Sequence, residues 1–289
     1  MCEHDDFDEF ARRSGKLTRR QFGAMALGAG LTAMLPRLAN AAETKGAAVE
    51  VKTPDGVADA YFVHPAKGKH PGVLIWPDIF GLRPAFTEMA TRLAESGYSV
   101  LVVNPFYRTK KAPTAPEHAD FNDPATRQSL MALAGTLNAD TTVSDAKAFV
   151  AFLDEQAAVD KKKKIGTTGY CMGGPMVMRT AATLSSRIGA GATFHGGGLV
   201  TDKPESPHLL IPQMKAHFLI AIAENDDGKQ PTAKDTLRDA FAQAKLPAEI
   251  EVYEGTMHGW CPTDSQVYNH DQAEKAWGRL LALFGSSLA

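Results

Sequence analysis

Cys171 lies where the sequence predicts a nucleophile. It is the third residue of the segment GYCMGG (residues 169–174), between a predicted strand, Ile165–Tyr170, and a predicted helix. A nucleophile between two glycines in that context sits on a sharp strand-to-helix turn. Flanking side chains larger than hydrogen would collide there, and Gly169 and Gly173 meet that need. The turn would place the sulfur at a helix N-terminus, which stabilises a thiolate. The pattern predicts nucleophilic catalysis; the alternative is a buried cysteine in a glycine-rich turn.

An acid and a histidine follow in chain order, each after its own predicted strand. Asp226 and Asp227 come after His217–Ala223, and His258 comes after Glu249–Tyr253. Nucleophile, acid and histidine in this order form a hydrolytic triad in α/β proteins. The histidine would take the thiol proton and later deliver it to the leaving group, while the acid would hold the imidazole in the required tautomer. Only one aspartate can face the histidine, and Asp226 is favoured over the alternative acid, Asp227.

Strands that alternate with helices must position these residues. Short apolar runs, some of them continuous as in strands buried on both faces, predict eight strands, at 48–52, 60–63, 72–76, 99–103, 165–170, 190–195, 217–223 and 249–253. Helical periodicity predicts helices at 85–95, 142–155, 172–185, 232–244 and 272–284, and residues 112–123 are expected to form a loop. The expected fold is α/β: a mainly parallel central sheet of about eight strands with helices on both faces. Ligands bind beyond the carboxyl ends of such strands, where the candidate residues lie.

The chain resembles the dienelactone hydrolase (carboxymethylenebutenolidase-like) family of α/β-hydrolases from about Val49 to Phe284. The resemblance rests on the segment PDIFGL (77–82), Asn104-Pro105, GYCMGG, the acidic segment 224–227 and His258-Gly259. It implies hydrolysis of a cyclic enol-lactone or similar ester through a thioester acyl-enzyme, without a metal or organic cofactor. It also implies an oxyanion hole formed by the backbone N–H groups of Ile79 and Met172. Turn geometry independently favours Met172, the residue after the nucleophile.

The sequence departs from the family's pattern in ways that bear on the substrate. Asp78 stands where dienelactone-type members have a glutamate thought to help deprotonate the thiol. It is a candidate thiol activator; the alternative is a carboxylate that caps a helix or holds a loop. The arginine that the family has shortly after the histidine is missing. Arg108 lies near the place of another anion-binding arginine and is a candidate substrate ligand, with a solvent-exposed arginine as the alternative. Tyr107 and Trp260 would suit a more apolar or aromatic acyl group.

The first forty-one residues predict an export signal rather than part of the fold. Arg19-Arg20-Gln21-Phe22 precedes an apolar stretch from Gly23 to Leu35, and Ala39-Asn40-Ala41 offers a cleavage site. The paired arginines favour the twin-arginine route and its export machinery as a partner. The stretch is shorter than the roughly 20 residues of a transmembrane helix. We expect a single α/β-hydrolase domain at 42–289, located in the periplasm or secreted. The formal net charge of −2 gives no reason to expect a nucleic acid as partner.

The sequence contains three cysteines, and their number and position allow functions other than hydrolysis. Cys2 would be lost with the signal, so Cys171 and Cys261 would remain. A disulfide between them is formally possible, but we expect a free thiol at Cys171. Two alternatives to a hydrolase are a non-catalytic periplasmic ligand-binding protein on a hydrolase scaffold and a thiol-redox protein that uses both cysteines. The remaining histidines show no metal-ligand spacing and are interpreted as surface or core residues: His64, His70, His118, His195, His208, His217 and His270.

Overall fold

A single mixed sheet organises the part of the chain that the structure describes. The structure is a computed structural model that describes residues 42–288, so the predicted export signal at 1–41 lies outside the described residues. The eight strands follow the order β1-β2-β4-β3-β5-β6-β7-β8. β1 and β2 form an antiparallel hairpin and β2 pairs antiparallel with β4, whereas all neighbours from β4 to β8 are parallel. The strands are β1 (Thr44–Thr53), β2 (Gly56–Pro65), β3 (Gly72–Trp76), β4 (Ser99–Val103), β5 (Ile165–Tyr170), β6 (Ile188–Phe194), β7 (His217–Ala223) and β8 (Ala248–Tyr253).

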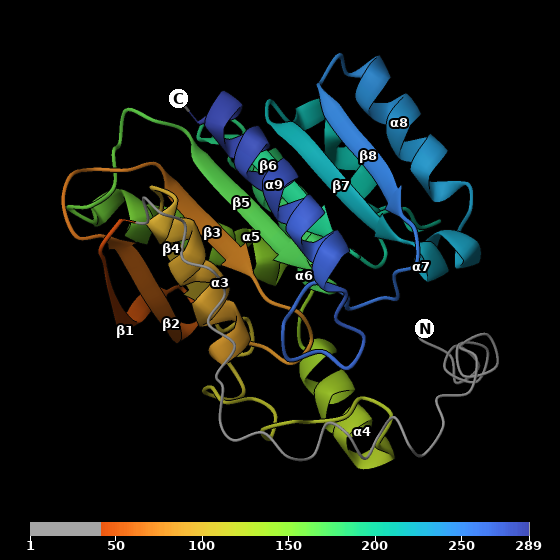
Figure 1. The fold of residues 1–289 in the computed structure, drawn as a ribbon, viewed down its shortest axis with the longest axis horizontal. Helices are drawn as coiled ribbons and strands as arrows, with labels where there is room; N and C mark the ends of the chain where they lie inside the picture. The colour runs from red at the N-terminus through yellow and green to blue at the C-terminus, as the bar shows by residue number, and fades with distance from the viewer. Residues whose placement is uncertain (1–41, 289) are drawn as a thin grey trace. The chain divides into compact units, whose positions relative to one another are not determined.

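Helices cover both faces of this sheet (Figure 1). Helices α3 and α9 pack on one face, and α5, α6, α8 and the short 3-10 helix η1 pack on the other. The helices are α3 (Pro84–Glu95), α4 (Pro124–Ala134), α5 (Ala139–Glu155), α6 (Gly173–Thr183), η1 (Pro207–Gln213), α7 (Glu224–Lys229), α8 (Ala233–Gln243) and α9 (His270–Ser287). Figure 1 shows α4 apart from both faces, beyond the arrowheads of the central strands. The expected α/β-hydrolase architecture is confirmed.

The two cores are separated by the alternation of side chains along each strand. In β3, Val73 and Ile75 enter the core under α3 and α9, whereas Leu74 and Trp76 enter the core under α5 and α6. All five residues of β3 are buried. A strand that is apolar on both faces is what a parallel sheet covered on both sides requires, since successive side chains point to opposite faces.

Four predicted strands, at 72–76, 99–103, 165–170 and 217–223, match the structure residue for residue, and residues 112–123 form a loop as expected. Two α-helices, α4 and α7, and the 3-10 helix η1 were not predicted. Helix α4 begins after Asp123, whose side chain accepts a hydrogen bond from the backbone N–H of Thr126 and so caps the helix. Residues 224–227, expected as an acidic loop, instead form the first turn of helix α7. The correction matters because the candidate triad acids lie on that turn.

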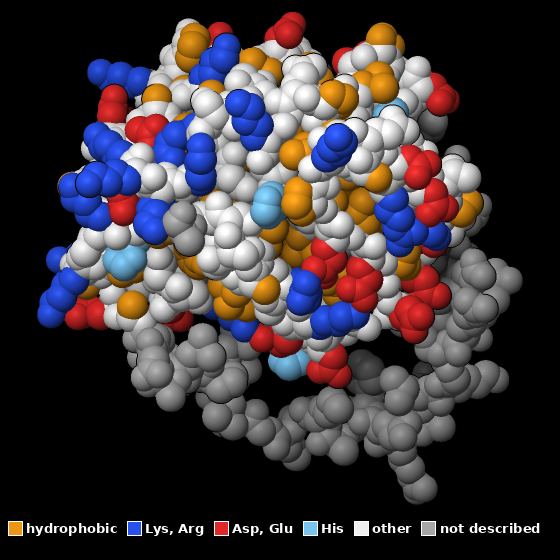
Figure 2. Space-filling model, turned by 90° about the horizontal axis from the view of Figure 1, so that it is seen from above, with side chains coloured by type: hydrophobic (Ala, Val, Ile, Leu, Met, Phe, Trp, Pro, Cys, Tyr) orange, Lys and Arg blue, Asp and Glu red, His pale blue; other side chains and the backbone are white. Residues whose placement is uncertain are grey.

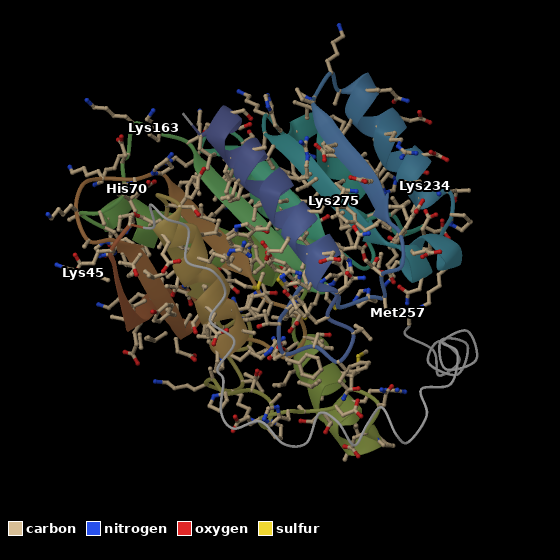
Figure 3. The ribbon with its side chains drawn as sticks, in the orientation of Figure 1. Lys45, His70, Lys163, Lys234, Met257 and Lys275 are labelled. Atoms are coloured by element: carbon tan, nitrogen blue, oxygen red, sulfur yellow. The ribbon has the colours of Figure 1, made fainter. Side chains whose placement is uncertain are left out.

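The carboxyl ends of the parallel strands define one edge of the sheet. Lys163 precedes β5 and Met257 follows β8, and Figure 3 shows these two residues at opposite ends of the sheet. The face seen in Figure 2 carries acidic side chains across its width, and its densest group of basic side chains is on the left of the view. Within residues 42–288, no helix is long and apolar enough to span a membrane.

Candidate active site

The turn between β5 and α6 places Cys171 in a strained conformation. Its φ is 52°, in the left-handed region that side-chain-bearing residues rarely adopt. A Cβ atom at Gly169 would lie 2.4 Å from the backbone oxygen of Gly173, and one at Gly173 would lie 2.3 Å from the backbone oxygen of Trp76. Both glycines are therefore sterically required, as the sequence predicted. The tight turn brings the cysteine to the N-terminus of α6.

Backbone hydrogen bonds fix the turn against the end of β6. The N–H of Cys171 donates to the carbonyl of Phe194 (3.0 Å), and the carbonyl of Cys171 accepts from the N–H groups of Gly174 (3.1 Å) and Gly197 (3.3 Å). The Cys171 residue is partly exposed and its thiol is free. Strain in the backbone is thus maintained by neighbouring segments while the sulfur remains reachable.

His258 lies beside one of the two candidate acids. Its Nδ1 atom is 2.7 Å from Oδ2 of Asp226. Asp227, in contrast, makes two contacts with the ammonium of Lys234, at 2.6 and 2.7 Å. Of the two aspartates that the sequence left open, the structure brings Asp226 to the histidine. A carboxylate bound to Nδ1 leaves Nε2 of the imidazole for exchange of protons.

Three consecutive side chains of α7 hold the segment that carries His258. The carboxylate of Glu224 accepts a hydrogen bond from the N–H of Gly255 (2.6 Å), and the side-chain oxygen of Asn225 accepts one from the N–H of His258 (2.8 Å). Asp226 binds the ring itself. Sequence reasoning considered only the aspartates here. Polar residues directly after a strand were the available signal, but their partners could not be deduced because they lie about thirty residues away.

The environment of His258 favours its protonated form. Burial lowers the pKa of His258, but the negative charge of Cys171, together with the hydrogen bond and the charge of Asp226, outweighs burial and raises this pKa well above the ordinary value. The Nε2 atom is buried and has no hydrogen-bond partner of acceptable geometry. The sulfur is therefore close enough to His258 to interact with its charge, while Nε2 is not committed to another group.

The loop after β3 contains Ile79, one of the two predicted oxyanion donors. The backbone carbonyl of Asp78 accepts from Gly81 (2.9 Å), and the hydroxyl of Thr114 donates to the carbonyl of Phe80 (2.8 Å). Gly81 has a φ of 77°, and a Cβ atom there would lie 2.4 Å from the Thr114 hydroxyl. Met172, the other predicted donor, is the N-cap of α6, where a helix leaves N–H groups without partners of its own.

Asp78 is bound by an arginine. Arg83 makes a bidentate contact with Asp78 (2.6 and 2.9 Å) and a second one with Asp264 (2.6 and 3.0 Å), and Oδ1 of Asp78 also accepts from the N–H of Phe80. The Arg83 side chain, 15% exposed, thereby joins the loop after β3 to the loop after His258. These contacts match the loop-holding interpretation of Asp78. Its role as a thiol activator stays a prediction.

Tyr107 and Arg108, predicted to bind substrate, lie in a set of mutually bonded side chains. The guanidinium of Arg108 contacts Asp145 at 2.7 and 2.8 Å and Asp55 at 2.5 and 3.0 Å. The Tyr107 hydroxyl donates to Asp145 (2.7 Å) and lies 2.7 Å from the hydroxyl of Thr53. Burial raises the pKa of Asp145, which is 2% exposed, although both partners oppose the shift. All polar groups of the pair thus have protein partners, and their contact with substrate stays a prediction.

Trp260 and Cys261 are core residues behind His258. Trp260 is fully buried and stacks on Tyr253 with ring centroids 4.8 Å apart. Cys261 is buried, its thiol is free, and burial raises its pKa well above the ordinary value. A buried thiol that resists ionisation is a poor redox partner. The predicted role of Trp260 in acyl-group binding is not tested by these contacts.

His195, interpreted from the sequence as a surface or core residue without a catalytic role, lies beside His258. It directly follows β6, and its ring packs on that of His258 with centroids 5.1 Å apart and an interplanar angle of 66°. It is 1% exposed. The available signal was its place at the carboxyl end of a predicted strand, 190–195, at the edge where ligands bind in such sheets. Among residues 42–288, no group of three or more His, Cys, Asp or Glu side chains could hold a metal ion.

Comparisons with known proteins agree with this architecture. The chain is 28% identical over 238 residues to a putative carboxymethylenebutenolidase of Methylorubrum extorquens, covering 80% of this chain and 78% of that protein. It is 25% identical over 215 residues to a carboxymethylenebutenolidase of Rhodococcus opacus, covering 73% and 79% of the two chains. The crystal structure of a putative dienelactone hydrolase from Klebsiella pneumoniae superposes with a TM-score of 0.72 at 22% identity, over 84% of this chain and 99% of that one.

The family assignment rests on the greater part of the chain. The model of the dienelactone hydrolase family matches residues 58–288, a range that runs from β2 to the end of α9 and includes Cys171, Asp226 and His258. The chain belongs to the dienelactone hydrolase family and is a hydrolase of the lactone or ester type.

Proposed function

We propose that this hydrolase cleaves its ester or lactone through a thioester on Cys171, with His258 as acid and base and Asp226 as the carboxylate that orients it. One observation carries the proposal: a cysteine at φ 52° interacts with a histidine whose Nδ1 is bound to Asp226 and whose Nε2 has no other partner. A strained nucleophile, a base within reach and a third group that orients the base are the elements of nucleophilic acyl transfer.

The first half-reaction forms the acyl-enzyme. The Cys171 thiolate attacks the carbonyl carbon and forms a C–S bond, and the electron pair of the C=O bond moves onto oxygen. The N–H groups of Ile79 and Met172 stabilise this oxyanion, each such donor contributing about 3 kcal/mol in the transition state. When the carbonyl re-forms, the C–O bond to the leaving group breaks, and the His258 imidazolium gives its proton to the departing oxygen.

The second half-reaction releases the acid. Neutral His258 takes a proton from water as the water oxygen attacks the thioester carbon. The C–S bond then breaks, the sulfur leaves as thiolate, and the carboxylic acid departs. The thiolate and the imidazolium are thereby restored, with one water consumed for each ester cleaved. The negative charge of Asp226 stabilises the imidazolium in both halves because it lies 2.7 Å from the ring.

Substitution of Cys171 tests the proposal. We expect Cys171→Ala to abolish hydrolysis of a p-nitrophenyl ester and Cys171→Ser to leave at most a small remnant, because a serine hydroxyl is not ionised by the same histidine. Wild-type turnover in Cys171→Ala would reject the proposal. A ligand-binding protein would bind esters without turnover in any variant. A thiol-redox protein would require Cys261, so Cys261→Ala would impair it while leaving a hydrolase active.

We also propose that the protein is exported by the twin-arginine route and acts in the periplasm or outside the cell. The support is the sequence of residues 1–41, which lie outside the described residues. The N-terminal residue of the protein recovered from its producing cells tests this: a start near Ala42 is expected, and an intact residue 1 would contradict export with cleavage.

A further inference from the structure

The ring of His195 is enclosed by aromatic groups and by His258. Tyr170 lies on one side with centroids 6.0 Å apart, and Trp260 lies on another with centroids 6.3 Å apart. The ring of His258 is nearer, at 5.1 Å and edge-on. The backbone N–H of His195 donates a hydrogen bond to the backbone carbonyl of Ala221 on β7 (2.8 Å), which fixes the backbone of His195 beside His258.

The backbone conformation and the buried ring nitrogens of His195 both cost free energy. Its φ is 41°, in the left-handed region, and such a conformation costs about 1–3 kcal/mol in a residue other than glycine. Both ring nitrogens are buried and have no hydrogen-bond partner. An apolar ring would avoid the second cost. Unpartnered buried polar atoms of this kind call for an explanation, and the ring centroid that lies nearest to that of His195 among its ring contacts is that of His258, at 5.1 Å.

The charge state of His195 is set by its surroundings. Burial lowers the pKa of His195 well below its ordinary value, and the positive charge of His258 lowers it further. The ring is therefore neutral and carries one N–H and one lone pair. The groups that interact with the charge of His258 are Cys171 on the β5–α6 turn and Asp226 on α7, both negative when ionised, and neutral His195 after β6.

We propose that His195 is a positioning residue for His258, whose neutral ring turns a nitrogen lone pair toward the His258 imidazolium and stabilises that charged form. The inference rests on the proposed function, since it concerns the same thiolate and imidazolium. A dipole fixed in a water-excluded site acts more strongly than in solvent and needs no reorganisation during the reaction. On this proposal, the ring nitrogens of His195, rather than the shape of its ring, stabilise the protonated form of His258.

The test follows the titration of His258 by NMR in the full-length chain labelled with nitrogen-15 histidine. We expect His195→Phe, which retains a ring but loses both nitrogens, to lower the pKa of His258 by about 0.5 or more. His195→Asn should lower it less, because asparagine tolerates the left-handed backbone and retains a polar acceptor. The matched control is Phe194→Leu: Phe194 is equally buried and stacks on Tyr170, and we expect its loss to leave the His258 titration unchanged.

The outcomes separate this inference from the proposed function. A wild-type pKa for His258 in both His195 variants, or an equally large shift in Phe194→Leu, would overturn the role of His195. The Cys171→Ala variant checks the function itself, because removal of the thiolate should lower the pKa of His258. If Cys171→Ala left the pKa of His258 unchanged, the proposed interaction of Cys171 with His258 would be rejected. If Cys171→Ala lowered this pKa and His195→Phe did not, only the proposed role of His195 would be rejected.

Discussion

Two groups of polar side chains differ in whether their polar atoms have partners: one surrounds Arg108, in the segment after β4, and the other consists of residues that follow β5, β6 and β8. In the paired cluster, made of Asp55, Tyr107, Arg108 and Asp145, the charged and hydroxyl groups bind one another. In the open cluster, made of Cys171, His195 and His258, the sulfur is free, and His258 Nε2 and both nitrogens of His195 lack hydrogen-bond partners.

Backbone strain follows the same division. Cys171 and His195 both have positive φ, and both belong to the open cluster. Unsatisfied polar atoms and left-handed backbone each cost free energy, so a fold tolerates them where reactivity requires them. The paired cluster shows the usual solution for buried charge, in which each group is neutralised by a partner. Between these two clusters, the one with unpartnered polar atoms, rather than the one with more charged groups, contains the candidate catalytic residues.

After loss of the nucleophile itself, the largest expected effect on turnover comes from Asp226, the acid at the edge of the open cluster. Asp226→Asn should lower kcat by about 10⁴-fold, because an amide no longer stabilises the imidazolium or fixes its tautomer. Asp227→Asn is the matched control, one residue along and bound to Lys234; its loss should leave kcat near the wild-type value. Steady-state hydrolysis of a p-nitrophenyl ester measures both. An equal loss of kcat in the two variants would show that contact with His258 does not determine which aspartate acts as the triad acid.

A smaller effect on turnover is expected from Arg83, which joins the two loops that flank the open cluster. Arg83→Gln leaves the buried carboxylate of Asp78 without its cation and should destabilise the fold by about 3 kcal/mol. It should also lower kcat by about tenfold, because the loop that bears Ile79 is no longer fixed. Urea unfolding and ester hydrolysis measure the two effects.

Arg92→Gln is the control for Arg83. Arg92 pairs with Glu274 on α9 and lies over the Trp277 ring, and both charged side chains are about one-third exposed. Its loss should change stability by less than about 1 kcal/mol and leave kcat unaltered. If Arg83→Gln retained wild-type kcat despite its loss of stability, the contacts of Arg83 with Asp78 and Asp264 would stabilise the fold without contributing to catalysis.

The smallest effect on turnover should come from the paired cluster. Arg108→Gln removes the cation of buried Asp145 and should destabilise the fold by about 3 kcal/mol, with kcat and KM near the wild-type values at a temperature where the protein is folded. A substrate-binding role predicts a different result: KM would rise for an ester with a free carboxylate and not for a neutral ester. Such a selective rise in KM would show that Arg108 binds the carboxylate of the substrate.

Local patterns made the main elements of fold and site predictable. The strands at 72–76 and 165–170 are short apolar runs, and the two glycines around Cys171 meet a steric need that arises within the turn itself. The side chain of Asp123 followed by a proline was a local signal for α4 that the loop-like composition around it masked.

Partnerships between distant segments could not be predicted. Nothing near Asp226 in sequence distinguishes it from Asp227; the difference is that one faces His258 and the other Lys234. Arg83 was not singled out because its two partners, Asp78 and Asp264, lie on separate loops. His195 resembles any histidine after a strand until the ring of His258 is seen against it. Pairing depends on tertiary structure, and sequence spacing does not encode it.

Trapping of the covalent intermediate tests the central claim most directly. The full-length protein is mixed with a p-nitrophenyl ester, quenched in acid within milliseconds to seconds, and weighed intact, after which the modified peptide is identified by fragmentation. We predict one added acyl group on Cys171 in the wild type and none in Cys171→Ala. An acyl group on a different residue, or complete turnover with no acylated Cys171 at any time, would contradict the account.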